Sequence, residues 1–319
     1  MDTKPRQAPQ FRVGFLLIDG FALMSYAAAV EPLRAANLLG QDTLYDIRHI
    51  SAAGAFAISS SGAGIPAMAH EDAPEDFDLV LVFAGGDPAQ FQDRHVFRWL
   101  RHLAARGVRL GGVSGGPVIL AAAGVMAGRR MTVHWEHAEA LAAISPGLII
   151  ERSLYVIDRD RITCAGGIAP LDMMHALLTE HHGSAFTRAV SDWFMHTEIR
   201  PSGGPQRAGL AERHGTNTPA VIGAIEAMEN HIADPLDLGQ LARLAGIGPR
   251  QLNRLFGDKM GRSTMKFYTQ LRLAKARALV EQSPLPLTEI ALATGFASSA
   301  HFSHAFRSAY GQTPSSLRA

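Results

Sequence analysis

Cysteine is almost absent from this 319-residue chain, which contains only Cys164. A single cysteine cannot form an intramolecular disulfide, so a disulfide-stabilised secreted domain is excluded. The N-terminus begins with polar residues and has no apolar signal core, so we expect no export and a cytoplasmic setting. An overall charge excess is also missing, since 30 Lys and Arg nearly balance 29 Asp and Glu.

No long apolar segment has the composition of a membrane-spanning helix. Residues 110–128 carry no charge, but they contain six glycines, Ser114 and Pro117, and their apolar residues are largely alanine. A strand, a tight turn and a helix in a buried α/β core explain this segment better than a bilayer does. With 47% hydrophobic and 18% charged residues, the chain is globular, and its length favours two domains.

Short apolar strands alternate with helices over the first two-thirds of the chain. The run FRVGFLLI at residues 11–18 is typical of a strand buried on both faces. Further strands are predicted at 45–51, 77–86, 108–113 and 130–135 and in two runs within 148–167, and helices at 22–40, 96–107, 116–124, 169–183 and 185–199. This order predicts an α/β fold whose parallel or mixed sheet has helices on both faces.

The composition changes after residue 199. Residues 200–218 lack periodicity and are rich in Gly, Pro and Arg, which predicts a linker, and residues 219–319 read as entirely helical. From Arg243 onward, 11 Lys and Arg stand against 3 Asp and Glu, as a nucleic-acid-binding end requires. We therefore expect four regions: a disordered tail (1–10), a first domain (11–199), the linker (200–218) and a second domain (219–319).

The second domain contains two similar units. Residues 238–261 and 287–311 each show a short helix, a glycine-containing turn and a second helix, which is the helix-turn-helix pattern. Gly246 and Gly295 allow the positive φ that such a turn needs. The amphipathic segment 263–283 is predicted to form a long helix that links the two units rigidly.

The second helix of each unit has one apolar face and one face of hydrogen-bonding side chains. Such side chains read base edges and phosphates. The predicted DNA contacts are Arg250, Gln251, Asn253 and Arg254 in the first unit and Ser298, Ser299, His301, His304 and Arg307 in the second. An ordinary bundle with a solvated basic face is the alternative, but two matched units make it the weaker one. Gly248 at the start of the first such helix predicts weak capping.

Residues 220–319 resemble the DNA-binding domain of the AraC family of transcriptional regulators, most closely in EIALATGFASSAHFSHAFRSAYGQTP at 289–314. The resemblance implies a monomeric two-reader module whose recognition helices enter successive major grooves on one face of the duplex. It also implies double-stranded promoter DNA and RNA polymerase as partners.

Residues 112–116, GVSGG, form a G-x-S-x-G pattern, the nucleophile elbow of many hydrolases. Segments between residues 11 and about 185 resemble the DJ-1/PfpI-like, glutamine-amidotransferase-type fold, a flavodoxin-like three-layer α/β sandwich. The resemblance implies a catalytic cysteine at the elbow, a histidine on the next strand and a glutamate from the first helix. In this sequence those places are taken by Ser114, His134 and Glu31.

Three interpretations of Ser114 compete. A serine hydrolase needs a base and an orienting acid, and the residues that can be named for these roles are Asp158 or Asp172 with His175 or His181, none of them in a recognisable motif. A DJ-1-like enzyme would lack its thiolate, because the elbow residue is serine. Cys164 does not substitute for it, since we expect that residue to be buried near a strand end. We favour a binding pocket in which the hydroxyl and the N–H groups of the turn hold a carboxylate.

Several other side chains have simpler structural explanations. His134 and His137 are only three residues apart and lack an evident third ligand, so we expect no metal, and no cofactor is implied. The His181–His182 pair at a helix end is expected to be solvated and favourable to the helix dipole. The aromatic residues Trp135, Trp193 and Phe194 could line a ligand cage, but we expect them in the core.

Together the two resemblances predict a ligand-responsive, sequence-specific DNA-binding regulator, similar to those of glycine betaine, dimethylglycine, sarcosine, carnitine and arginine catabolism. We expect a non-enzymatic activator that forms a homodimer, does not bind membranes and responds to a small zwitterionic carboxylate such as an N-methylated amine or amino acid. The predicted effector contacts are Glu31, Gly86, Ser114, Gly115, His134 and Trp135. The alternative is a hydrolase or amidotransferase-like enzyme that uses Ser114 and carries a DNA-binding appendage.

Overall fold

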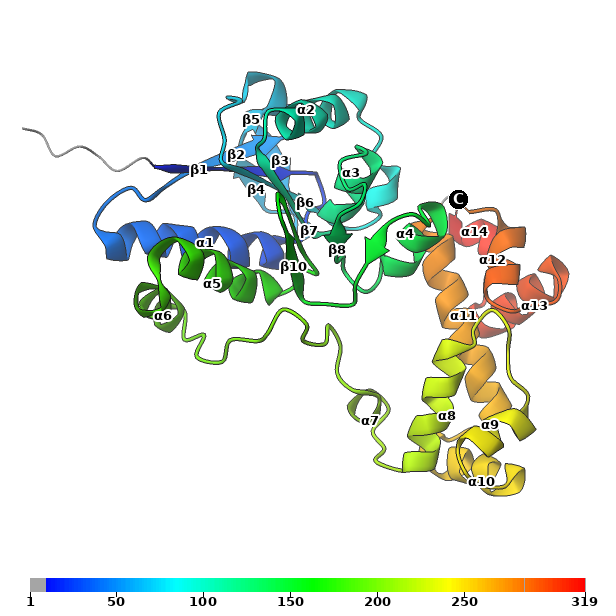
Figure 1. Ribbon diagram of the computed structural model, residues 1–319. Helices are drawn as coiled ribbons and strands as arrows, with labels where there is room; N and C mark the ends of the chain where they lie inside the picture. The colour runs from blue at the N-terminus through cyan, green and yellow to red at the C-terminus, as the bar shows by residue number, and fades with distance from the viewer. Residues whose placement is uncertain (1–9, 284, 319) are drawn as a thin grey trace, which may run out of the picture. The chain divides into compact units, whose positions relative to one another are not determined.

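The computed structural model describes residues 10–283 and 285–318. It divides the chain into two compact units, which meet in the sequence between Gln206 and Arg207 (Figure 1). That boundary falls inside the stretch 200–218 that was predicted as a linker. Residues 1–9 of the predicted tail lie outside the described residues.

A seven-stranded sheet forms the centre of the N-terminal unit, in the order β10-β11-β7-β6-β1-β2-β5. Neighbouring strands are parallel except for the antiparallel pair β10–β11. The strands are β1 (Phe11–Leu17), β2 (Tyr45–Ser51), β5 (Met68–Ala69), β6 (Leu79–Ala84), β7 (Arg109–Ser114), β10 (Tyr155–Asp158) and β11 (Arg161–Cys164). Because β1, β6 and β7 are covered on both faces, they are almost continuously buried and apolar.

Helices cover both faces of this sheet (Figure 1). Side chains of α1 (Leu23–Gly40), α5 (Ala169–His182) and α6 (Ser184–Trp193) build the core on one face. Side chains of α2 (Arg94–Ala105), α3 (Gly116–Ala122) and α4 (Ala138–Ile144) build the core on the other. The predicted three-layer α/β sandwich is confirmed.

The short elements were predicted least well. The hairpin β3 (Phe56–Ile58) and β4 (Gly64–Pro66), the strand β5 and helix α4 were not predicted. Within 148–167 the chain forms three strands, β9 (Ile149–Ile150), β10 and β11, where two were predicted. The strand predicted over 130–135 is only β8 (Arg130–Met131), so His134 lies in the loop that follows it. Elements of two or three residues are too short to show a hydrophobic period.

Helix α6 ends at Trp193 rather than at residue 199. The buried carboxylate of Asp172 draws the next segment away from the helix, because it accepts hydrogen bonds from His196 Nε2 at 3.0 Å and from the backbone N–H of Arg200 at 2.9 Å. Met195 takes a positive φ of 56° where the chain turns out of the helix.

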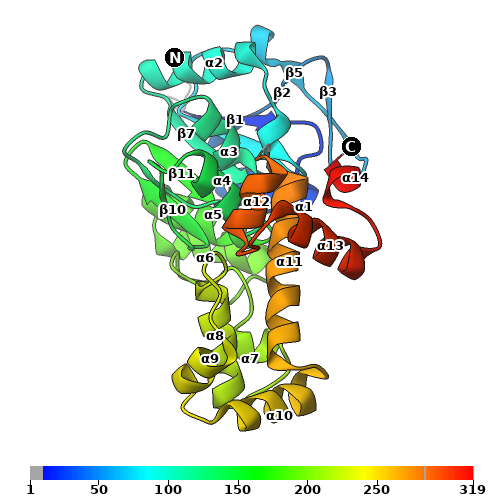
Figure 2. The same ribbon diagram turned by 90° about the vertical axis from the view of Figure 1, so that its right-hand side faces the viewer.

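The described part of the C-terminal unit is entirely helical, as predicted. Its helices are α7 (Leu210–Arg213), α8 (Pro219–Asn230), α9 (Leu238–Leu244), α10 (Pro249–Met260), α11 (Thr264–Gln282), α12 (Leu287–Ala293), α13 (Ser299–Tyr310) and α14 (Pro314–Arg318). The long α11 runs through this unit from α10 to α12 and α13 (Figure 2). Helix α7 forms inside the predicted linker, where Arg213 pairs with Glu229 of α8 at 3.1 Å.

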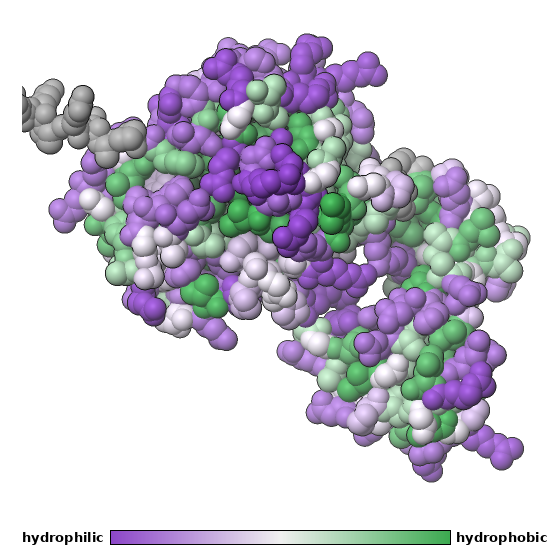
Figure 3. Space-filling view, in the orientation of Figure 1, coloured by the Kyte–Doolittle hydropathy of each residue, from purple (hydrophilic) through white to green (hydrophobic). Residues whose placement is uncertain are grey.

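Among the described helices, none is long and apolar enough to cross a bilayer. Residues 110–128, the uncharged stretch of the sequence, form the end of the central strand β7, the elbow and helix α3. The face of the N-terminal unit seen in Figure 3 is largely hydrophilic, with apolar residues showing between the polar ones.

Candidate functional site

The G-x-S-x-G segment forms a sharp turn between β7 and α3. Ser114 ends the strand with a φ of +61°, a region that side-chain-bearing residues rarely adopt and that costs about 1–3 kcal/mol. A Cβ on Gly112 would lie 2.5 Å from Pro117 N, and one on Gly116 would lie 1.9 Å from Val82 O. The backbone of a nucleophile elbow is therefore present, with glycine where the chain approaches itself.

The first-helix residue beside the elbow is Ser25. A Cβ added to Gly166, whose φ is +94°, would lie 2.8 Å from Ser114 Cβ and 3.0 Å from Ser25 Oγ, so the bare glycine brings the two serines together. Ser25 is fully buried, and its hydroxyl has no hydrogen-bond partner among the residues that the structure describes. A buried hydroxyl left unpaired is costly, and it marks a place where a polar ligand atom or a water would be favourable.

Glu31, which was predicted to approach the elbow, is engaged elsewhere. It lies six residues after Ser25 on α1, its side chain is 41% exposed, and its carboxylate accepts a hydrogen bond from Arg34 Nε at 2.6 Å. The structure thus places Ser25 beside the elbow in its stead. The available signal was a single polar residue in the apolar run ALMSYAAAV, which sequence reasoning passed over.

The backbone of the elbow offers fewer donors than predicted. The N–H of Gly115 donates to Ala84 O at 3.0 Å, because the pairing of β6 with β7 continues to the end of both strands. Pro117 has no N–H at all. The prediction that Gly115 presents a free donor is therefore wrong, and the hydroxyls of Ser25 and Ser114 are donors that the structure places there instead. Gly86, also predicted, is exposed two residues after β6, with a φ of +60°.

His134 lies at the elbow, and Trp135 packs against it. The N–H of His134 donates to Ser114 O at 3.3 Å, and its Nδ1 accepts from the N–H of Glu136 at 3.4 Å. Burial lowers the pKa of His134, which favours the neutral ring. Trp135 packs its ring 5.2 Å from the His134 ring and is 42% exposed. The expectation of a core position was wrong for Trp135, and equally for Trp193, which is 50% exposed, while Phe194 is half-buried.

One candidate catalytic acid, Asp172, has a structural role instead. Asp172 is fully buried, and Arg200 donates to its Oδ2 from Nε at 3.0 Å and from Nη2 at 2.6 Å. His196 and the Arg200 backbone occupy its other oxygen. This carboxylate therefore anchors the chain segment after α6.

The other candidate acids, bases and nucleophiles are also bonded elsewhere. Asp158 pairs with Arg159, His175 bonds to Ser191 Oγ at 2.9 Å, and His181 bonds to Tyr45. Cys164 is fully buried as predicted, and burial raises the pKa of its thiol to about 12, so the thiolate is not formed near neutral pH. The described residues contain no cluster of His, Cys, Asp and Glu suited to a metal ion.

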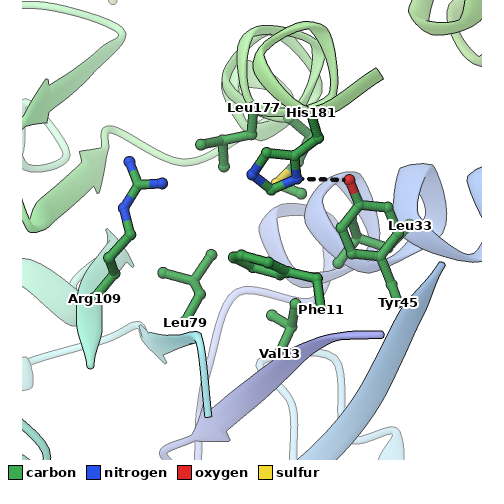
Figure 4. Close-up of a pocket in the computed structure, with 9 residues that line it drawn as sticks. Phe11, Val13, Leu33, Tyr45, Leu79, Arg109, Leu177 and His181 are labelled. Carbon is green, nitrogen blue, oxygen red and sulfur yellow. Dashed lines mark hydrogen bonds between the residues drawn. The ribbon is translucent and has the colours of Figure 1, made fainter. Parts of the chain in front are cut away.

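A small apolar hollow lies at the opposite end of the sheet, where β1, β2, β6 and β7 begin (Figure 4). Its free volume of about 10 Å³ is that of one water molecule, too little for an effector. Tyr45 Oη closes it by bonding to His181 Nδ1 at 2.8 Å and to His182 Nε2 at 2.9 Å. The expectation of a solvated pair was wrong for His181, which is half-buried under this hydroxyl, whereas His182 is exposed.

Both helix-turn-helix units form as predicted. Helices α9 and α10 are joined through Gly246 with a φ of +70°, and α12 and α13 through Gly295 with a φ of +71°. The two units differ at the start of the second helix. Gly248 gives α10 no side-chain cap, whereas Ser298 Oγ accepts the N–H of His301 at 3.2 Å and caps α13.

The second helices expose the faces predicted to contact DNA. The exposed residues are Arg250, Gln251, Asn253 and Arg254 on α10 and Ser298, His301, His304 and Arg307 on or next to α13, with Ser299 half-buried. Asn253 also has a structural role, since its Oδ1 accepts the N–H of Thr264 at 3.0 Å and so caps α11. On the opposite faces, Phe256 and Phe306 are fully buried.

Two family profiles match this chain. That of the DJ-1/PfpI family covers residues 11–180, and that of a helix-turn-helix domain covers residues 241–319. The HTH-type transcriptional regulator GlxA of Rhizobium meliloti is 48% identical over 308 residues, which are 96% of this chain and 95% of GlxA. The HTH-type transcriptional regulator CdhR of Pseudomonas aeruginosa is 38% identical over 305 residues, or 96% of this chain and 90% of CdhR.

A solved structure agrees with these relatives in the N-terminal unit. The crystal structure of an AraC family transcriptional regulator from Pseudomonas putida superposes with a TM-score of 0.53 at 27% identity, covering 58% of this chain and 99% of that one. Because GlxA and CdhR each align with 96% of this chain, the likeness to regulators extends over both the N-terminal and the C-terminal unit.

Proposed function

Because the chain belongs to the transcriptional regulators that join a DJ-1/PfpI domain to an AraC-type helix-turn-helix domain, we propose that it activates genes of amine or amino-acid catabolism in response to an effector bound at the elbow. The C-terminal unit reads promoter DNA with α10 and α13. The N-terminal unit binds the effector and performs no catalysis.

The proposed DNA binding is supported by the exposed polar faces of α10 and α13 in the two helix-turn-helix units. Arg250 and Arg254 on α10, and Arg307 on α13, stand free of the apolar core and carry charge that suits phosphates or guanine edges. Residues 243–319 supply the basic excess that steers a protein to DNA.

The observation that carries the effector half is the buried, unpaired hydroxyl of Ser25 next to Ser114. The neighbouring hydroxyls of Ser25 and Ser114 can both donate to a carboxylate oxygen, which accepts hydrogen bonds without requiring a charged partner. Ser25 thereby joins Ser114 as a donor to the carboxylate end of the effector, and the hydroxyls replace the N–H of Gly115 in that role.

Three exposed apolar side chains are close in sequence to residues that surround the elbow. Met24 next to Ser25, Ile168 close to Gly166, and Trp135 next to His134 are 62%, 49% and 42% exposed. A quaternary ammonium group has no N–H to donate, and it is recognised by the face of an aromatic ring. Trp135 therefore favours an N-methylated zwitterion over a primary amine.

The non-enzymatic role is supported by the bonding of the candidate acids and bases. A serine hydroxyl is a weak nucleophile without an adjacent base, and Asp172, His175 and His181 are each bonded elsewhere. A serine-reactive phosphonate should leave the protein unlabelled, and Ser114→Ala should change no hydrolytic rate. Stoichiometric labelling of Ser114 would instead support the alternative of a hydrolase or amidotransferase-like enzyme.

We also propose that the chain forms a homodimer and contacts RNA polymerase at the promoter. Both points rest on the resemblance to AraC-family regulators alone. Analytical ultracentrifugation of the intact chain, with and without promoter DNA, measures the first point. Transcription in vitro with purified RNA polymerase measures the second, with a rise in transcript expected when effector is added.

Calorimetry on the intact chain tests the effector site. Glycine betaine, dimethylglycine, sarcosine, carnitine and arginine are titrated first, and we expect at least one to bind. Ser25→Ala should then weaken binding of that compound by about ten- to hundredfold, since one hydrogen bond to a charged group contributes about 1.5–3 kcal/mol. The variant should fold normally, because the hydroxyl that it removes has no protein partner.

Ser191→Ala is the matched control. Ser191 is also a buried serine of the N-terminal unit, but its hydroxyl bonds to His175 at 2.9 Å. Its loss should lower the free energy of unfolding by about 1 kcal/mol and leave effector affinity unchanged. Unchanged affinity in Ser25→Ala would place the effector elsewhere.

A further inference from the structure

Two side chains of α11 reach the two helix-turn-helix units from one face of the helix. Tyr268 and Arg272 are four residues apart, so they lie one turn from each other on the same side. Tyr268 is fully buried and Arg272 is half-buried. At these residues α11 passes from the first helix-turn-helix unit to the second.

Arg272 holds the turn of the second unit. Its Nε donates to Thr294 O at 2.8 Å, and its Nη2 donates to Gly295 O. The guanidinium carbon also lies 4.4 Å from the centre of the Phe296 ring. One planar group thus satisfies the carbonyls that follow α12 and stacks on the next residue of the turn.

Tyr268 holds the segment that leads into the first unit. Its hydroxyl donates to His231 O and accepts the N–H of Leu236 at 3.4 Å. Residues 231–236, which connect α8 to α9, are therefore fastened to the same face of α11 as the second turn.

These two fastened segments also touch each other. A Cβ added to Gly295 would lie 2.5 Å from Pro235 Cγ and 2.6 Å from Ile232 O, so the turn of the second unit packs directly on the connection of the first. The two units are joined by this contact as well as by α11. Because Gly295 has a φ of +71° and no room for a side chain, the packing admits little adjustment.

We propose that Arg272 is a positioning residue that fixes α13 relative to α10, and so sets the spacing of the two operator half-sites that one chain can read. This inference rests on the proposed reading of DNA by both units. Arg272 acts through the turn at Thr294 and Gly295 and not by touching DNA, because its guanidinium is occupied by two carbonyls and a ring.

Arg277 provides a matched control on the same helix. It carries the same charge, lies 5.2 Å from the Tyr310 ring, and pairs with Glu281 of α11 at 2.8 Å. These contacts lie within α11 and the second unit, so they do not bridge the two turns. Arg277→Ala removes a charge and a ring contact without cutting the junction.

The experiment measures affinity of the intact chain for its own promoter site by fluorescence anisotropy. The same DNA is also tested with one, two or three base pairs inserted between the half-sites. The wild-type chain should lose about tenfold or more in affinity when the spacing changes, because both recognition helices can no longer engage together. Arg272→Ala should bind the native spacing about tenfold more weakly and discriminate between spacings less than about threefold.

Arg272→Lys should behave like Arg272→Ala, since an ammonium group cannot make the forked contact or the stack. The salt dependence of binding should not change in either variant, because no phosphate contact is lost. Arg277→Ala should keep the spacing discrimination. Circular dichroism and thermal unfolding establish that each variant is folded.

The contrary results are distinct. An Arg272→Ala chain that still discriminates like the wild type would overturn the inference while leaving DNA binding intact. Equal weakening at every spacing, with the salt slope reduced by about one, would show that Arg272 is a phosphate contact. A wild-type chain without affinity for any of these DNAs would overturn the proposed function as well.

Discussion

The elbow of the N-terminal unit and the turns of the C-terminal unit are both glycine-dependent backbone motifs, but they differ in the chemistry that accompanies them. At the elbow, Ser114 keeps the strained φ and Gly116 keeps the close approach to Val82. The candidate acids and bases, however, are bonded elsewhere. At the turns, Gly246 and Gly295 keep their positive φ, and the helices that follow still expose charged and hydrogen-bonding side chains.

This difference shows that the backbone shape of a motif does not by itself supply the chemistry that the motif carries elsewhere. The sharp turn at Ser114 lies close to the buried, unpaired hydroxyl of Ser25, which is a favourable place for a polar ligand atom. Function therefore follows from the side chains around a turn, and the pattern of glycines alone does not decide it.

The largest expected effect tests whether Asp172 is structural. Asp172→Asn should lower the free energy of unfolding of the N-terminal unit by about 3 kcal/mol, because a fully buried carboxylate loses its charge opposite Arg200, whose side chain is 35% exposed. Chemical denaturation of the intact chain measures this loss. Asp46→Asn removes an exposed pair with Arg48 and should cost no more than about 1 kcal/mol. Unaltered stability in Asp172→Asn would reopen a catalytic role for this carboxylate.

An intermediate effect tests the exposed helix faces. Arg254→Ala and Arg307→Ala should each weaken promoter binding by about 1–3 kcal/mol if the side chain contacts a base. If it contacts a phosphate, the salt slope should fall by about one unit. Fluorescence anisotropy at several salt concentrations distinguishes the two cases. Arg34→Ala, on the exposed side of α1 in the other unit, should change neither quantity; full affinity in both helix variants would exclude these faces from the interface.

The smallest effect concerns the caps of α10 and α13. Gly248→Ser should stabilise the C-terminal unit by only a few tenths of a kcal/mol, since glycine is already tolerated at an N-cap. Ser298→Ala should destabilise it by about 1 kcal/mol, because the bond to the His301 N–H is lost. Thermal unfolding measures both. Destabilisation by Gly248→Ser would mean that the backbone there needs glycine for another reason.

The sequence predicted most of the fold because its long elements carry strong periodic signals. The continuous apolar runs of β1 and β6 and the matched glycines of the two turns are local features that packing does not override. Elements of two or three residues, such as β4 and β5, carry too little pattern to be recognised. The end of α6 was misplaced because a buried carboxylate 24 to 28 residues earlier, Asp172, accepts hydrogen bonds from His196 and Arg200 and so positions that segment.

The candidate site was predicted in part. Ser114 and His134 lie at the elbow, with Trp135 packed against His134, because they are in the motif or on the next segment. Ser25 was missed because its role depends on how α1 packs against Gly166, which no local pattern encodes. The tyrosine that turns His181 inward comes from β2, 136 residues away, and the same kind of distant contact hides the junction made by Arg272.

The central claim is that the C-terminal unit reads DNA by itself while the N-terminal unit supplies the response to the effector. The most direct measurement is the affinity of residues 207–319 for promoter DNA as a function of salt, in the presence and absence of the effector found by calorimetry. This fragment includes α7, whose Arg213 pairs with Glu229. We predict binding that weakens with a slope of about −0.9 per phosphate contacted and is unaffected by the effector. A fragment that shows no salt-sensitive binding, or that responds to the effector without residues 1–206, would contradict the account.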